Sequence, residues 1–111
     1  MDQERRQVPR FSFIATAEVI EERSEARIAT RVSELSSQGC YLDMMNPFPS
    51  GTAVLVKIWE GENYFEARAK IAYADKHLGV GIAFLEVADK FAPVLLGWLN
   101  EAERRRKLSE N

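Results

Sequence analysis

The first three quarters of the chain alternate between apolar and polar residues. From Phe11 to Val19 an apolar side chain stands at every second position, with Ser12, Thr16 and Glu18 between them. A period of two is typical of a β-strand that buries one face. Further runs of this kind, separated by turn-forming residues, lie at 28–32, 40–42, 54–58, 65–73 and 79–84.

Within the run 65–73, we expect one apolar face and one charged face. The expected buried face consists of Phe65, Ala67, Ala69, Ile71 and Tyr73. Short strands with a turn about every ten residues are typical of sandwiches and barrels. Closure into a barrel would also remove the exposed edges that apolar strands otherwise leave. The pattern therefore predicts a mainly β protein, a six-stranded antiparallel barrel.

The period changes after Asp89. Apolar residues then recur at the spacing of one helix face, at Phe91, Val94, Leu95, Trp98, Leu99 and Ala102. We expect a C-terminal α-helix over 89–107, with Asp89 as its N-cap and Pro93 in its first turn. The basic run 104–107 suits the negative end of the helix dipole. The apolar stripe should pack on the barrel or on a partner.

The length of 111 residues predicts a single domain with a modest core. We divide residues 1–111 into a flexible arm over 1–10, a barrel over 11–88 and the helix over 89–107. The arm is polar and is not expected to fold alone. A formal net charge of −2 disfavours binding to DNA or RNA, which normally needs a clearly basic face.

Cys40 is the only cysteine, so no disulfide can form within the chain and a reducing compartment is expected. No segment has the apolar stretch of a signal peptide or the length of a membrane span. We therefore expect a cytoplasmic protein without membrane insertion. No Cys/His cluster has metal-ligand spacing, and no nucleophile motif is present, so we expect neither a metal site nor an enzyme.

Two short segments carry the candidate binding chemistry. Arg6 and Arg10 stand four residues apart on the arm, and the segment 34–39 reads ELSSQG, with a carboxylate, a hydroxyl and a glycine. Each segment alone is weak evidence. The arginine spacing recurs twice between Arg23 and Arg31, where a solvated strand face explains it. Serine and glycine are also common in plain turns, because Ser caps turns and Gly supplies positive φ.

Together the two segments resemble the RxxxR and (D/N)xSxxG motifs of the PilZ domain, a bacterial receptor module for cyclic di-GMP. Their order and spacing agree, and the segment 79–84, with its Gly-x-Gly-x-x-Phe pattern, also fits. The resemblance implies a PilZ-like barrel with a C-terminal helix. It implies that Arg6 and Arg10 hold phosphate and guanine, with Arg5 adding a further contact.

In the same resemblance, Glu34, Ser36 and Gly39 would read guanine edges, with Gly39 allowing close backbone approach. Glu34 departs from the pattern, since the family usually has Asp or Asn there. A carboxylate on either side chain accepts from the guanine N1–H and N2–H₂ edge. Glutamate is longer, so fixing it loses more rotamer entropy, and it can instead pair with an arginine of the arm. We expect binding to be retained but weakened.

The predicted function is a non-enzymatic cyclic di-GMP receptor or adaptor. Ligand binding would order the arm 1–10 and signal to a protein partner. One alternative is a PilZ-like adaptor that binds no nucleotide and acts through its helix or the loop 44–49. In that loop, Met44 and Met45 are either a partner-facing patch or gap-filling side chains. The other alternative is a small barrel that binds single-stranded nucleic acid, which the net charge disfavours.

Overall fold

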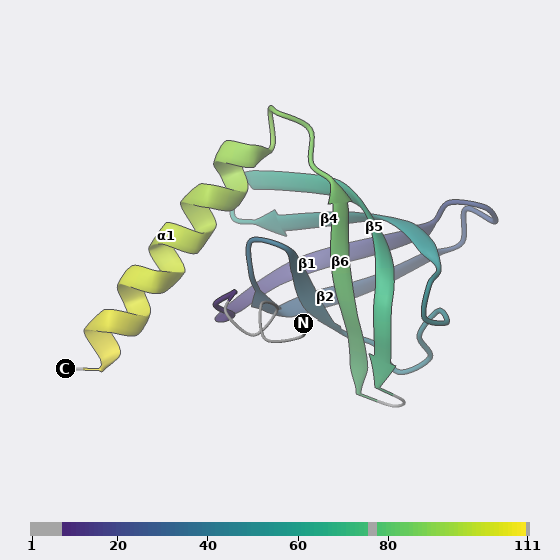
Figure 1. Cartoon of the computed structure of the whole chain (residues 1–111), viewed down its shortest axis with the longest axis horizontal. Helices are drawn as coiled ribbons and strands as arrows, with labels where there is room; N and C mark the ends of the chain where they lie inside the picture. Colours follow the sequence, from purple (N-terminus) through teal and green to yellow (C-terminus); the bar gives the residue numbers. More distant parts are fainter. Residues whose placement is uncertain (1–7, 76–77, 111) are drawn as a thin grey trace.

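The computed structural model describes residues 8–75 and 78–110. The described part folds into six strands followed by one helix, as Figure 1 shows. In chain order these are β1 (Phe11–Glu21), β2 (Arg27–Leu35), β3 (Gly39–Asp43), β4 (Ala53–Glu60), β5 (Asn63–Asp75), β6 (Gly79–Glu86) and α1 (Ala92–Ser109).

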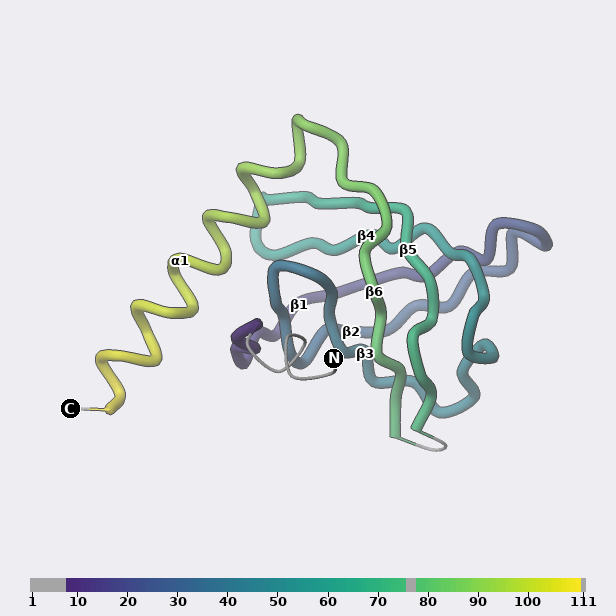
Figure 2. The backbone as a smooth tube through the Cα atoms, viewed as in Figure 1, coloured from purple at the N-terminus to yellow at the C-terminus, as the bar shows by residue number. Residues whose placement is uncertain are grey.

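The strands form one closed barrel in the order β1-β2-β3-β6-β5-β4. Every neighbouring pair is antiparallel, including β4 with β1, which closes the sheet on itself. The path of the backbone is easiest to follow in Figure 2, where β3 passes beside β6. The prediction of a six-stranded antiparallel barrel with a C-terminal helix is confirmed.

The barrel core is built by the period-two pattern. Ala15, Ala17 and Val19 of β1 point inward and are buried, as predicted. The largest fully buried side chains, which come from all six strands, are Phe65, Leu35, Leu42, Ile58, Ile71, Val19, Val32, Val54, Val56 and Val80. None of the described polar or charged residues is buried, so the barrel interior is held by apolar contact.

Four register shifts interrupt the strand pairing, between Ser12 and Ala15, Val32 and Glu34, Arg68 and Ala69, and Ile71 and Tyr73. The shifts in β2 and β5 decide which side chains face the surface. In β2 the register with β3 shifts between Val32 and Glu34, so Leu35 rather than Glu34 is the next buried residue. In β5 the register with β6 shifts between Ile71 and Tyr73. A bulge of this kind adds one residue to one strand and reverses the faces beyond it. The prediction that Tyr73 shares the buried face was therefore wrong, because the side chain lies outside.

The helix begins later than predicted. Its N-cap is Phe91, which makes no side-chain capping hydrogen bond, so the prediction of Asp89 as N-cap was wrong. Phe91 instead packs against Tyr64 and Phe65, with ring centroids 5.6 and 6.2 Å apart, and this packing fixes the helix start. Pro93 lies in the first turn, as expected, and α1 runs to Ser109 rather than to 107.

Helix α1 contacts β1 and β5 at one end of the barrel (Figure 1). In its C-terminal half, the Arg106 guanidinium reaches the Phe11 ring at the start of β1. Leu95 and Trp98 are the buried residues of α1. The Trp98 ring lies 5.1 Å from Phe13 and 6.1 Å from Phe65 between centroids. Its buried Nε1–H has no hydrogen-bond partner among the described residues. Trp98 therefore anchors the helix by ring packing alone.

Trp98→Ala should lower the free energy of unfolding by about 3–5 kcal/mol, since it removes a large buried ring. Trp98→Phe should cost clearly less, because it keeps an aromatic ring and removes an N–H whose burial without a partner costs about 1–3 kcal/mol. Urea unfolding would measure both. Leu96→Ala is the matched control on the exposed face of α1, with an expected change within about 0.5 kcal/mol. Equal losses for the Phe and Ala variants would contradict an anchor made by ring packing.

Candidate functional site

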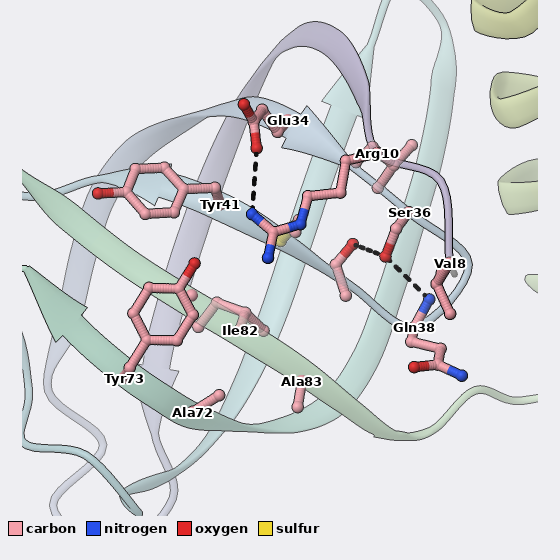
Figure 3. A pocket seen from close by; sticks show the side chains of 14 residues that line it. Val8, Arg10, Glu34, Ser36, Gln38, Tyr41, Ala72, Tyr73, Ile82 and Ala83 are labelled. Carbon is pink, nitrogen blue, oxygen red and sulfur yellow. Dashed lines mark hydrogen bonds and ion pairs between the residues drawn. The ribbon is translucent and has the colours of Figure 1, made fainter. Parts of the chain in front are cut away.

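A pocket of about 160 Å³ lies on the outer side of the barrel, where the chain enters β1. It is bordered by the end of the arm, the turn between β2 and β3, β3 itself, and the facing parts of β5 and β6 (Figure 3). Of the predicted site residues, the pocket brings together Arg10, Glu34, Ser36 and Gly39. Arg5 and Arg6 lie outside the described residues.

Strand register places Arg10 beside Glu34. Ser12 pairs with Glu34 across β1 and β2, and Arg10 stands just before β1 begins. The bulge in β2 turns Glu34 to the outer surface, where a strict alternation after Val32 would have turned it inward. Figure 3 shows the guanidinium of Arg10 reaching across the pocket to the carboxylate, 3.6 Å from Glu34 Oε1.

The ion pair between Arg10 and Glu34 is weak. The two side chains are 62% and 48% exposed, so water and salt screen the attraction between them. Exposed pairs of this kind typically contribute less than about 1 kcal/mol. The guanidinium and the carboxylate therefore hold each other in place while remaining available to a ligand that offers a better partner to either.

Ser36 closes the turn between β2 and β3. Its Oγ accepts a hydrogen bond from the Gln38 N–H at 3.1 Å and donates one to the Gly39 carbonyl at 3.3 Å. The Ser36 N–H donates to the same carbonyl at 2.9 Å. These bonds show a turn-capping role for the serine, and they hold its hydroxyl at the edge of the pocket.

Gly39 serves a different purpose from the one that turn chemistry predicts. Positive φ occurs at Gly51 and Gly61 but not at Gly39, so a left-handed backbone is not its reason. A Cβ on Gly39 would lie 1.9 Å from the carbonyl oxygen of Ile82 on β6. Glycine is thus required at this position because β3 and β6 approach too closely for a side chain. This requirement holds with or without a bound ligand.

The pocket also holds residues that the sequence motifs do not include. Tyr41 of β3 and Tyr73 of β5 line one side of it, together with Ala72, Ile82 and Ala83. Tyr73 was hidden from sequence reasoning because the bulge before it cannot be read from the alternation. Cys40 borders the pocket too, but its side chain is buried, and burial raises the pKa of the thiol to about 12, so the thiolate is not populated near neutral pH.

The family model of the PilZ domain matches residues 4–96. The chain belongs to the PilZ family. The match covers most of the arm, the barrel and the first part of α1, and it includes both motif segments of this PilZ chain. A search of curated proteins found no match.

Solved structures with the same fold include two further PilZ domains. The PilZ domain with c-di-GMP of YcgR from Escherichia coli has a TM-score of 0.73 at 16% identity, covering 96% of this chain and 97% of that one. The PilZ domain of CeSA from a cellulose-synthesising bacterium has a TM-score of 0.64 at 17% identity, covering 80% and 96%. At sequence identities this low, the structural similarity establishes a shared fold and nothing more.

The Bacillus subtilis inhibitor of motility (MotI/DgrA) also matches, with a TM-score of 0.71 at 19% identity over 95% of this PilZ chain. The match covers 52% of that protein, so the chain spans about half its length. Within the part of the chain that the structure describes, no helix is long and apolar enough to cross a membrane. The same residues contain no group of three or more His, Cys, Asp or Glu side chains that could hold a metal ion.

Gly39→Ala should lower the free energy of unfolding by about 1–3 kcal/mol, because the new methyl group overlaps the Ile82 carbonyl. Gly97→Ala is the matched control: it makes the same chemical change on exposed α1, where a Cβ meets nothing within 4 Å. This control should stabilise the protein by about 0.5–1 kcal/mol. Thermal unfolding of both variants checks the prediction, and a Gly39→Ala variant as stable as the parent would refute the close approach of β3 and β6.

Proposed function

We propose that the protein is a non-enzymatic, cytoplasmic receptor that binds cyclic di-GMP at the pocket beside the β2–β3 turn. The observation that carries the proposal is the convergence of Arg10, Glu34, Ser36 and Gly39 on one pocket at the end of the arm. The PilZ family match and the fold shared with a PilZ domain solved with c-di-GMP support it. Arg6, and with it Arg5, would complete the site from the arm.

The chemistry of these groups suits a guanine dinucleotide. A guanidinium donates paired hydrogen bonds to phosphate or to guanine O6 and N7, and its plane stacks on purine faces. The Glu34 carboxylate accepts from the N1–H and N2–H₂ edge of guanine. Charged hydrogen bonds contribute roughly 1.5–3 kcal/mol each, whereas ordering the arm costs about 1–2 kcal/mol per residue. Micromolar affinity corresponds to about −8 kcal/mol, so the contacts made by the arm and the pocket together must exceed the ordering cost by that amount.

The ion pair between Arg10 and Glu34 opposes ligand binding slightly. A ligand that takes the guanidinium for phosphate must displace the carboxylate or share it, and the exposed pair resists with less than about 1 kcal/mol. The glutamate at position 34 reaches Arg10, and a shorter Asp or Asn side chain would reach less far. The departure from the usual Asp or Asn would therefore lower the affinity for cyclic di-GMP without abolishing it.

Signalling to a protein partner would pass through the start of β1. Arg10 borders a second, larger cavity of about 640 Å³ between β1 and α1, which also includes Phe11 and Trp98. Across this cavity the Arg106 guanidinium lies 4.9 Å from the Phe11 ring centroid, a cation–π contact. Ordering the arm and Arg10 around a ligand would reshape this cavity and so change the surface offered to a partner.

The second cavity also favours the alternative function, an adaptor that binds no nucleotide. An adaptor would use the space between β1 and α1, or the loop after β3. In that loop Met44 is buried and fills the core, whereas Met45 is 69% exposed and is free to meet a partner. Binding of single-stranded nucleic acid remains the third candidate. We propose that neither DNA nor RNA is the ligand, on the net charge of −2.

Calorimetric titration with cyclic di-GMP should give micromolar binding for the parent protein and none for the double variant Arg6→Ala, Arg10→Ala. The matched control is Arg23→Ala, Arg27→Ala, which removes two exposed arginines of the same spacing that do not line the pocket. This control should bind within a few-fold of the parent. No heat from the parent at tens of micromolar ligand would reject the receptor and favour the adaptor, and salt-dependent binding of an oligonucleotide instead would favour the third candidate.

Glu34→Asp should tighten binding of cyclic di-GMP by up to about fivefold, since the shorter carboxylate gives up the pair with Arg10 worth less than about 1 kcal/mol. Glu18→Asp is the control, because Glu18 forms a comparable pair with Arg27 at 3.3 Å elsewhere on the barrel. The control affinity should not change. A marked loss of affinity in Glu34→Asp would show that the longer side chain is itself fitted to the ligand.

A further inference from the structure

One side of the pocket is an aromatic wall. Tyr41 and Tyr73 lie side by side there, with ring centroids 6.3 Å apart and planes inclined by 38° (Figure 3). Tyr73 is 40% exposed and belongs to the last four residues of β5, all of which are exposed. Neither tyrosine belongs to the two motif segments.

The backbone makes specific room for both rings. The bulge in β5 before Tyr73 turns this side chain from the core to the pocket. A Cβ on Gly81, its partner on β6, would lie 2.2 Å from the Tyr73 ring, and a Cβ on Gly79 would lie 2.8 Å from the Tyr41 ring. Each ring thus lies against the backbone of β6 in space that only glycine leaves open, which limits its motion and directs it along the pocket wall.

A hydrogen bond fixes Tyr41 in this arrangement. Its hydroxyl donates to Asp75 Oδ2 at 3.0 Å. Partial desolvation and this bond to a carboxylate raise the pKa of Tyr41 to about 12, so the hydroxyl stays protonated and keeps donating near neutral pH. Tyr41 is therefore held at both ends, by Asp75 at its hydroxyl and by β6 beneath its ring, and it supports the neighbouring Tyr73.

Charge is distributed unevenly around the pocket. The Arg10 guanidinium reaches across it and attracts phosphate. Beyond the Tyr41 hydroxyl lies Asp75, whose carboxylate repels phosphate but suits the N–H donors of a base. A ligand with phosphates and purines would accordingly place phosphate at Arg10 and a base over the tyrosines.

We propose that Tyr73, supported by Tyr41, is a stacking platform for the second purine base of the dinucleotide. The proposal rests on the proposed function and adds a recognition element outside both motifs. The first guanine would meet Glu34 and the β2–β3 turn, and the second would lie on the exposed face of Tyr73. Stacking on an aromatic side chain is sequence-tolerant, so this platform adds affinity for a purine ring rather than a choice between purines.

Tyr73→Leu and Tyr73→Phe test the platform by titration with cyclic di-GMP. Leucine keeps an apolar side chain without a ring, and affinity should fall about tenfold, within the range found for loss of one base–aromatic stack. Phenylalanine keeps the ring and should bind within about twofold of the parent. Trp59→Leu is the matched control, because Trp59 is 38% exposed and lies outside the pocket. Its affinity should be unchanged.

A second measurement uses the unmodified protein, so it does not depend on how a variant folds. In NMR spectra of the complex, ring protons of Tyr73 should show nuclear Overhauser contacts to a purine H8, and that H8 should move upfield. Binding by the parent without these contacts would overturn the platform and leave the receptor standing, as would parent-like affinity in Tyr73→Leu or equal losses in Tyr73→Leu and Trp59→Leu. Absence of binding by the parent would reject the receptor and the platform together.

Discussion

The close approach of β3 to β6 is the constraint on which the rest of the structure depends. At Gly39 this approach leaves no space for a side chain below the Ile82 carbonyl, and the same pairing continues through the buried core residue Leu42. It joins the β1–β2–β3 half of the barrel to the β6–β5–β4 half. It also brings the β2–β3 turn against β5 and β6, so that the barrel and the pocket are assembled by one contact.

The fold was predictable from the sequence because alternation and helical spacing report directly on burial. The inward face of β1 and the stripe around Trp98 followed from period alone. The bulges in β2 and β5 were not predictable, since an extra residue changes the faces only relative to a partner strand that the sequence does not specify. The helix start was misplaced for a related reason: packing of Phe91 on Tyr64 and Phe65 outweighed the capping preference of Asp89.

The candidate site was predictable to the extent that it lies in short motifs. Arg10, Glu34, Ser36 and Gly39 do meet at one pocket. The motifs could not reveal which contacts these residues make in the free protein. Arg10 and Glu34 form an ion pair, and Ser36 caps its own turn. Gly39 is required by the close approach of the β6 backbone. Each of these residues thus has a structural reason to be present, and loss of function on mutating one of them is not by itself proof of a ligand contact.

The two bulges have a consequence for how such a protein can vary. Each amounts to one inserted residue, and everything beyond it on the strand changes face if that residue is removed. Substitutions of outward-facing residues at the pocket do not change the inward-facing residues. The ligand specificity can therefore change while the core stays the same. Deletion of a single residue near Ser33 would instead exchange Glu34 and Leu35 between the pocket and the core. In these segments, chain length is under tighter constraint than residue identity.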